Sequence, residues 1–413
     1  MKDSTDGTPQ HSKKDRLERR KAIVGFAVTA ILFAVLLVTR PGWRDSIYLI
    51  IGFILIIMLH EFGHFVVAKR AGMKVTEFFL GFGPRLWSFH KGETEYGIKL
   101  IPLGGYVRII GMHNMEQVDP ADEPRTYRAA PFHKRLPVVL AGVTVNLILA
   151  FVLMYAVIWR QGIPDSPTRS VALVSQGGAA AKAGFQKGDQ IRSINGKNMK
   201  TFEDVTGTVR ANKGKQLSVG ILRNGKPKNL TVTPIARCSV PSQGQIGIGP
   251  GTAFQRFGPV DAFGETTCTM YRMTADTGAF LGKFLSFSGL RTYGHEVVSA
   301  NSPACGSPAT DAHPLTPVGF VAFGSQLVDG NVWLLLALLA AVNLFVGLLN
   351  LLPILPFDGG HVAIAIYEKI ASMITKRNVR ADYRKLIPVL VVVLILFGLF
   401  AISELSLELR QLF

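Results

Sequence analysis

The chain has 413 residues, 48% of them hydrophobic, and a formal net charge of +17. Its mean hydropathy is positive and its apolar residues are gathered into long runs, which excludes an ordinary soluble globular protein. A basic chain can also bind nucleic acid, but here Lys and Arg are concentrated beside the apolar runs, so we expect no nucleic-acid partner.

A transmembrane helix needs about 20 mainly apolar residues, and five runs reach or approach that length. They cover residues 22–39, 47–68, 136–159, 332–352 and 386–402. The segments before the first run, after the second and after the fourth are rich in Lys and Arg, which cytoplasmic loops collect. We therefore predict a polytopic α-helical protein of the cell membrane, surrounded by the lipid bilayer. Its N-terminus is then cytoplasmic, and the region between the third and fourth spans is extracytoplasmic.

The predicted parts can be given in chain order. They are a basic cytoplasmic tail (1–21), an additional transmembrane helix (22–39), a transmembrane helix with a charged motif (45–68), a membrane-associated β-hairpin and cytoplasmic loop (69–135), a transmembrane helix (136–159), an α+β domain (168–236), an extracytoplasmic linker (237–331), a transmembrane helix with a second motif (332–360) and a last transmembrane helix (386–405). The run at 22–39 could instead be the core of a signal peptide. No small residues mark a cleavage site before Arg40, which favours an uncleaved anchor.

The second span contains the sequence "HEFGH", residues 60–64. In a helix, His60 and His64 lie one turn apart on the same face, where both imidazoles can hold one metal ion. Glu61, beside them, can act as a general base on water. The alternative is an amphipathic helix with its polar residues turned to solvent. A long apolar stretch precedes His60, however, and ionisable residues inside a membrane usually serve a function.

Residues 81–112 alternate between apolar and polar side chains around the turn signal Lys91-Gly92, which predicts β-hairpins on the cytoplasmic side of the membrane. An exposed strand edge there can hold an unwound peptide by β-augmentation, although an ordinary hairpin is the alternative. In the third span, Asn146 is a polar residue that more often bonds a neighbouring helix than a substrate.

The extracytoplasmic stretch of residues 177–199 predicts a strand over 190–194 followed by a hairpin turn at Asn195-Gly196. This region, placed at 168–236, resembles a PDZ domain, a fold that takes up peptide ends in a groove between a strand and a helix. Further on, residues 261–287 are predicted to form an amphipathic helix. The three cysteines lie in the outer region, where Cys238 and Cys305 could pair and Cys268 would remain free; three free thiols are the alternative.

The fourth span ends in "NLLPILPFDGGH", residues 350–361. Pro353 and Pro356 should end the helix there. Asp358 would then supply a carboxylate at the edge of the membrane, and catalytic zinc sites use three protein ligands. Asp358 is therefore a candidate third ligand. His361 is an alternative ligand, and a simple helix N-cap is an alternative role for Asp358.

Together, "HEFGH" and "NLLPILPFDGG" resemble the paired signature of the site-2 proteases, zinc enzymes that cut substrates within the membrane. The likeness covers nearly all of residues 45–405 and is greatest to bacterial members that carry an outward-facing PDZ domain and cleave anti-sigma factors. It implies that His60, His64 and Asp358 hold Zn²⁺, that Glu61 is the catalytic base, and that Asn350 holds the substrate. It also implies that the hairpin region binds substrate and that the PDZ domain screens substrates by bulk. The family core has four spans, so the span at 22–39 is an addition.

We therefore predict a zinc-dependent intramembrane endopeptidase. Its expected partners are a membrane-embedded protein substrate, such as an anti-sigma factor or a remnant signal peptide, and an upstream site-1 protease that trims the substrate first. One alternative is a non-enzymatic PDZ membrane sensor with a structural metal site, but structural zinc sites usually have four protein ligands. Another is a metal transporter, but the spans show no repeat with polar residues at matching positions.

Overall fold

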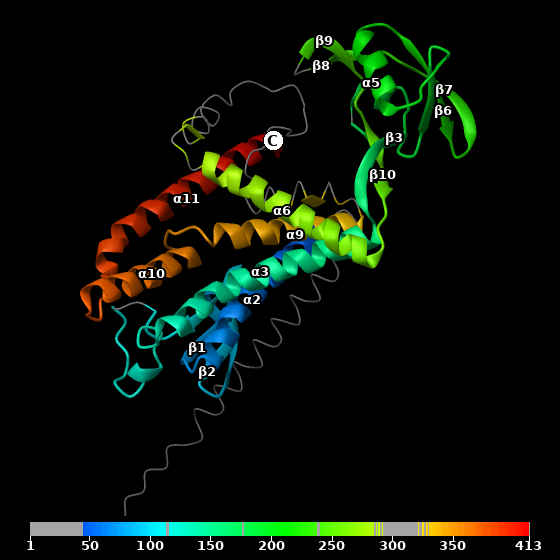
Figure 1. Cartoon of the computed structure of the whole chain (residues 1–413). Coiled ribbons are helices and arrows are strands. Elements are labelled where there is room, and N and C mark those ends of the chain that lie inside the picture. The colour runs from blue at the N-terminus through cyan, green and yellow to red at the C-terminus, as the bar shows by residue number, and fades with distance from the viewer. Residues whose placement is uncertain are drawn as a thin grey trace, which may run out of the picture. The chain divides into compact units, whose positions relative to one another are not determined.

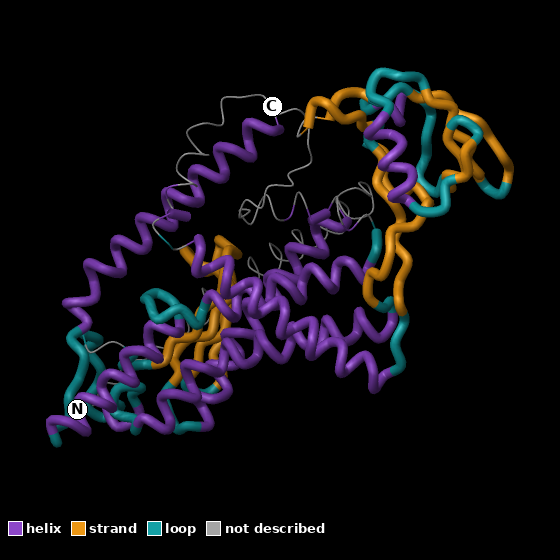
Figure 2. The backbone as a smooth tube through the Cα atoms, turned by 45° about the horizontal axis from the view of Figure 1, so that its top comes forward, coloured by secondary structure: helices purple, strands orange, loops and turns teal. Residues whose placement is uncertain are grey.

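The computed structural model of the chain describes residues 44–112, 115–175, 177–237, 240–284 and 330–412, together with a few residues between 286 and 328. These residues belong to two units. Among them, the first unit takes in residues 44–157, those from 266 to 297 and those from 314 onward, and the second takes in residues 158–265. Long helices dominate the first unit and strands dominate the second (Figure 2). The predicted tail and first span, and with them Cys238 and Cys305, lie outside the described residues.

Three described helices are long and apolar enough to cross a membrane: α2 (Arg44–Arg70), α3 (Phe132–Arg160) and α9 (Val332–Leu349). They contain most of the predicted second, third and fourth spans and run beside one another (Figure 1). The predicted fifth run, residues 386–402, lies within α11 (Tyr383–Leu412). Consecutive apolar side chains of α11 are exposed, as a lipid-facing helix requires, and its crossing of the membrane stays a prediction.

Helix α2 has a face buried in the protein and an exposed face that is apolar. Ile56, His60 and Gly63 are buried against the rest of the unit, whereas Leu59 and Phe62 are exposed. A helix in water would turn polar side chains outward, so an exposed apolar stripe indicates contact with lipid. The two histidines consequently face the protein interior.

Small residues let the helices approach one another closely. A Cβ atom on Gly63 of α2 would lie 2.8 Å from the Ala141 carbonyl oxygen of α3, and one on Gly52 would lie 2.7 Å from the Leu339 side chain of α9. Between α3 and α9, the Asn343 side-chain amide donates a hydrogen bond to the Asn146 carbonyl oxygen at 2.8 Å. Close packing of small residues and interhelical hydrogen bonds are what hold helices together in lipid.

Strands β1 (Val75–Lys91) and β2 (Thr94–Ile109) form the predicted hairpin, which turns at Gly92 with a φ of +65°. The hairpin packs against α2 (Figure 1), because a Cβ atom on Gly105 of β2 would lie 3.2 Å from Met58 Sδ. A side chain at residue 105 would therefore push the strand away from the helix.

Ion pairs hold the turn of this hairpin to its neighbours. The Glu93 carboxylate accepts hydrogen bonds from Lys69 Nζ at 3.1 Å and from both terminal nitrogens of Arg125 at 2.8 Å. The bonds from Arg125, and then those from Lys69, lower the pKa of Glu93 to about 2. Arg125 belongs to the short 3₁₀ helix η2 (Glu123–Arg125), so the loop before α3 is anchored to the hairpin.

The second unit is built on one antiparallel sheet with the order β10-β3-β4-β6-β7. Its elements are β3 (Ile163–Val174), α4 (Ala179–Lys182), β4 (Gln190–Ile194), β5 (Lys197–Asn198), α5 (Phe202–Ala211), β6 (Leu217–Arg223), β7 (Lys226–Val232), the separate pair β8 (Ile235–Arg237) and β9 (Val240–Gln245), and β10 (Ile248–Gln255). The predicted strand 190–194 and the turn at Asn195-Gly196 are both present. Strand β10 pairs with β3 and extends the sheet beyond the predicted range 168–236. Helix α6 (Pro259–Phe284) follows, where the sequence predicts a helix.

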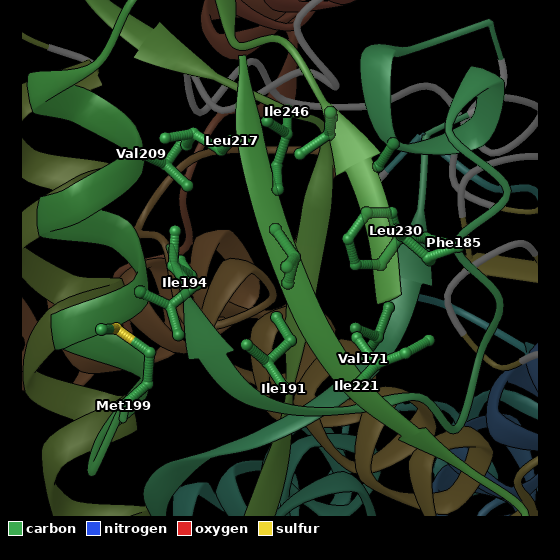
Figure 3. Packing of buried hydrophobic residues seen from close by; sticks show 14 of the residues in the cluster. Val171, Phe185, Ile191, Ile194, Met199, Val209, Leu217, Ile221, Leu230 and Ile246 are labelled. Carbon is green, nitrogen blue, oxygen red and sulfur yellow. The ribbon is translucent and has the colours of Figure 1, made fainter. Parts of the chain in front are cut away.

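One apolar core holds the second unit together (Figure 3). Ile191 and Ile194 of β4, Ile221 of β6 and Val209 of α5 are all buried in it. The helix is fixed at its start by a capping box, in which Thr201 and Asp204 exchange hydrogen bonds. The buried apolar residues of these short strands thus meet the apolar face of α5.

A buried ion pair adds to this core. Asp189 is 1% exposed and accepts hydrogen bonds at 2.7 Å from Arg223 Nε and Nη2 and at 2.8 Å from the Gln186 N–H. Burial alone would raise the pKa of Asp189, but these bonds outweigh it and the pKa is lowered. The carboxylate therefore stays charged and needs its arginine.

The variant Arg223→Met should destabilise the second unit, because the Asp189 carboxylate, which is 1% exposed, would lose its cationic partner. Limited proteolysis of the full chain at increasing temperature would measure this as earlier cleavage within residues 158–265. Lys226→Met, at an exposed position in the same hairpin, is the control. Equal protease resistance in the two variants would show that the ion pair adds nothing to stability.

Candidate metal centre

The structure brings together the three residues that the sequence predicts as metal ligands. His60 Nε2 and His64 Nε2 are 3.2 Å apart, and each lies 3.2 Å from Asp358 Oδ2. The histidines come from α2, and Asp358 is the first residue of α10 (Asp358–Thr375). Both histidines are buried, and the aspartate is partly so. Three ligand atoms therefore form a nearly equilateral triangle inside the protein.

Helix α3 orients one histidine and leaves room at the centre of the triangle. His64 Nδ1–H donates a hydrogen bond to the Val138 carbonyl oxygen at 2.7 Å, which turns the lone pair of Nε2 toward the centre. One turn further on, a Cβ atom on Gly142 would lie 2.4 Å from His64 Nε2 and 2.6 Å from His60 Nε2. Only glycine leaves this space open.

A tight loop presents Asp358. Helix α9 ends at Leu349, as Pro353 and Pro356 in the following segment require, and the Asn350 carbonyl oxygen accepts a hydrogen bond from the Gly359 N–H at 2.7 Å. A Cβ atom on Gly359 would lie 2.3 Å from two backbone carbonyl oxygens. The glycine after Asp358 is therefore needed to close the loop.

A zinc ion fits this donor set. In a tetrahedral site with bonds of about 2.0–2.1 Å, neighbouring ligand atoms lie about 3.3 Å apart, close to the spacing seen here. Asp358 Oδ2 is buried and has no hydrogen-bond partner among the described residues, yet it faces two imidazole nitrogens. When all three atoms are unprotonated they repel one another, and a shared metal ion would remove that repulsion. The described group holds three protein ligands, the number typical of catalytic zinc.

The hairpin fixes Glu61. The Val107 N–H of β2 donates a hydrogen bond to Glu61 Oε2 at 3.1 Å, and a Cβ atom on Gly105 would lie 3.4 Å from Glu61 Cγ. The strand thus holds the carboxylate next to His60 on the same helix. An acceptor in this position can take a proton from water.

The remaining candidates differ in their surroundings. Asn350 is the partly buried C-cap residue of α9, and no described residue makes a hydrogen bond with its side-chain amide. His361 is not in the group of metal-ligating atoms, and its ring centroid lies 6.4 Å from that of Tyr383. The backbone carbonyl of Asn146 accepts a hydrogen bond from Asn343 of α9, but neither polar atom of its buried side chain has a hydrogen-bond partner among the described residues, so its predicted role in helix packing stays a prediction.

Sequence reasoning missed three contributors to the site: Val138, Gly142 and Val107. Two of them act through backbone atoms, which no residue type reveals. Gly142 left a weak signal, since a glycine in an apolar span often marks a close approach.

The variant Gly142→Ala should weaken zinc binding by about 10- to 100-fold, because the methyl group must displace an imidazole that holds the ion. Metal analysis of the purified protein and chelator competition would measure the change. Gly278→Ala in α6 is the matched control, since its Cβ would meet nothing within 4 Å. Wild-type zinc affinity in Gly142→Ala would contradict the geometry.

Comparisons with known proteins identify zinc-dependent relatives. A family model described as Peptidase family M50 matches residues 48–397. The chain is 35% identical to Zinc metalloprotease Rip1 of Mycobacterium tuberculosis over 375 residues, which cover 82% of this chain and 91% of that protein. It is 34% identical to Zinc metalloprotease Rip1 of Mycolicibacterium smegmatis, over 82% of this chain and 90% of that protein. It is 28% identical to Metalloprotease MmpA of Caulobacter vibrioides, over 80% of this chain and 86% of that protein.

One solved structure also matches part of the chain. The PDZ domain of the SdrC-like protein from Listeria monocytogenes is 21% identical and covers 21% of this chain and 90% of that one, with a TM-score of 0.19, which is too low to support an argument. The family match, in contrast, spans most of the chain and includes both motifs. The chain therefore belongs to peptidase family M50, the site-2 protease family, and is a zinc metalloendopeptidase.

Proposed function

We propose that this enzyme cuts the transmembrane segments of single-pass membrane proteins, with His60, His64 and Asp358 holding the zinc ion. The observation that carries the proposal is the triangle of ligand atoms at 3.2 Å, with two of its corners on a helix apolar enough to span a membrane. Peptide hydrolysis at that depth requires a site buried in protein and supplied with water.

Bound zinc supplies a Lewis acid that polarises the scissile carbonyl and makes water more acidic. Glu61 accepts a proton from the attacking water and passes it to the leaving amide nitrogen as the C–N bond breaks. The hydrogen bond from the Val107 N–H holds Glu61 in place between these two transfers. The segments that follow α2 and α9 are rich in Lys and Arg, which predicts that the C-terminal ends of both helices lie on the cytoplasmic side. Water reaches the site from that side.

The hairpin holds the substrate in an extended form. A peptide bond within a helix is protected by its neighbours, so the substrate has to unwind before attack. The hairpin is a two-stranded sheet, so the outer edges of its strands can accept another strand by β-augmentation, and β2 touches Glu61. The Asn350 side chain donates a hydrogen bond to the backbone of the unwound segment.

The substrate class and partners follow from the likeness to bacterial site-2 proteases. The enzyme acts on anti-sigma factors or remnant signal peptides after a site-1 protease has trimmed them outside the membrane. The PDZ-like unit lies outside and excludes substrates that still carry a bulky domain, while the N-terminus is cytoplasmic. The placement of Lys and Arg supports this orientation.

The variant Glu61→Gln should retain zinc and lose cleavage of a transmembrane model substrate by about 100- to 10,000-fold, because the amide cannot accept the proton. His60→Ala and Asp358→Ala should lose both zinc and cleavage. Metal analysis and cleavage of a labelled substrate in detergent or vesicles would separate the two effects. A fully active Glu61→Gln protein would rule out this mechanism and favour a non-enzymatic sensor with a structural metal.

The variant Asn350→Ala should keep its zinc and lower kcat/KM about tenfold, the cost of about one hydrogen bond in the transition state. Steady-state kinetics with zinc content measured in parallel tests this. Asn198→Ala, an exposed position in the second unit, serves as the control. Unchanged kinetics in Asn350→Ala would remove this residue from the site.

A further inference from the structure

A second buried cluster of charges lies in the first unit, apart from the metal centre. Arg135 in the first turn of α3 donates a hydrogen bond through Nη1 to Glu368 Oε2 of α10 at 2.6 Å. The two residues are 9% and 4% exposed. Removing both charges from water is costly, and an apolar pair of similar size often gives as much stability. Stability alone is therefore a weak reason for an ion pair here.

The Glu368 side chain is held in one orientation by hydrogen bonds to both of its carboxylate oxygens. Its other oxygen, Oε1, accepts a hydrogen bond at 2.8 Å from the Ala381 N–H, in the connection between α10 and α11. The guanidinium of Arg135 lies over the Tyr127 ring, 5.7 Å from its centroid. Both carboxylate oxygens are thus engaged by different elements, which fixes the side chain and the part of α10 that carries it.

The same face of α3 serves the metal centre. Arg135, Val138 and Gly142 follow one another at the spacing of helical turns. Val138 accepts the hydrogen bond from His64, and Gly142 faces both imidazoles. On α10, Glu368 lies ten residues after Asp358, about 15 Å along the helix axis at 1.5 Å per residue. One face of α3 therefore contacts both the helix that carries the histidines and the helix that carries the aspartate.

Near its start, α10 makes an apolar contact with the core to which this face of α3 belongs. Val362 packs against the cluster that contains Val138 and Val139. Glu368 adds a second anchor six residues further on, about 9 Å along the axis at 1.5 Å per residue. Two anchors fix the direction of a rod, whereas one lets it pivot, and metal–ligand distances tolerate only about 0.2 Å.

We propose that Arg135 and Glu368 are positioning residues that set α10 against α3 and so hold Asp358 Oδ2 at the two imidazoles. The inference rests on the proposed role of Asp358 as a zinc ligand. It gives the ion pair a function in metal binding rather than in folding.

The double variant Arg135→Met with Glu368→Met tests this in the full chain, because it removes the pair without leaving a lone buried charge. We expect a folded protein with a wild-type melting temperature and zinc affinity weakened about 10- to 100-fold, measured by chelator competition. The cobalt-substituted variant should lose the intense visible absorption of a tetrahedral site. The separate variant Arg135→Lys, which keeps a cation beside Glu368, should retain most of the wild-type zinc affinity.

The variant Glu368→Gln covers the case in which the double variant does not fold. It keeps the shape of the side chain but can no longer accept hydrogen bonds through both terminal atoms, so zinc affinity should fall about tenfold. Asp189→Leu with Arg223→Met removes a buried ion pair from the second unit and should leave zinc affinity unchanged.

The outcomes separate the two claims. Wild-type zinc affinity and cobalt absorption in a folded double variant, or in Glu368→Gln, would overturn the positioning role, provided that Asp358→Ala loses zinc. Wild-type zinc affinity in Asp358→Ala would instead overturn the proposed ligand set.

Discussion

The structure depends on keeping three polar ligand atoms together inside an apolar layer. His60, His64 and Asp358 come from two segments almost three hundred residues apart, and their buried atoms face one another at 3.2 Å. With all three atoms unprotonated and no shared cation, such an arrangement is repulsive and poorly solvated, so the proposed binding of zinc would stabilise the docking of the segments, and docking would favour binding. Much of the first unit can be understood as the means of bringing these segments together.

Glycines and backbone groups bring most of these segments together. Gly63 and Gly142 let α3 lie against the histidine face of α2, and Gly359 closes the loop that presents Asp358. Backbone atoms of Val138 and Val107 orient His64 and Glu61. A backbone donor or acceptor held in regular structure cannot rotate away, and it keeps a reactive side chain in place with little entropic cost.

The sequence predicts what local pattern determines. The histidine spacing, the hairpin around Gly92 and the turn at Asn195-Gly196 depend on residues close in the chain, and the structure contains all three. The sequence does not reveal contacts between distant segments. Examples are the hydrogen bond from the Val107 N–H to Glu61 and the pairing of β10 with β3, which extends the sheet of the second unit. Asp358 can be proposed from the sequence because the prolines and glycines around it mark a forced break in a helix. Residues 22–39 lie outside the described part of the chain, and the crossing of the membrane by α11 remains a prediction.

The pairing of β3 with β10 bears on how this protein could have been assembled in evolution. Ile163 and Gln255 are paired, so the sheet of the second unit begins and ends at adjacent points. Paired strands lie about 5 Å apart, and domains whose ends are that close can be inserted into a host chain without disturbing its fold. Recombination could therefore lengthen, exchange or delete this sheet without changing the order of the helices that carry the candidate metal ligands.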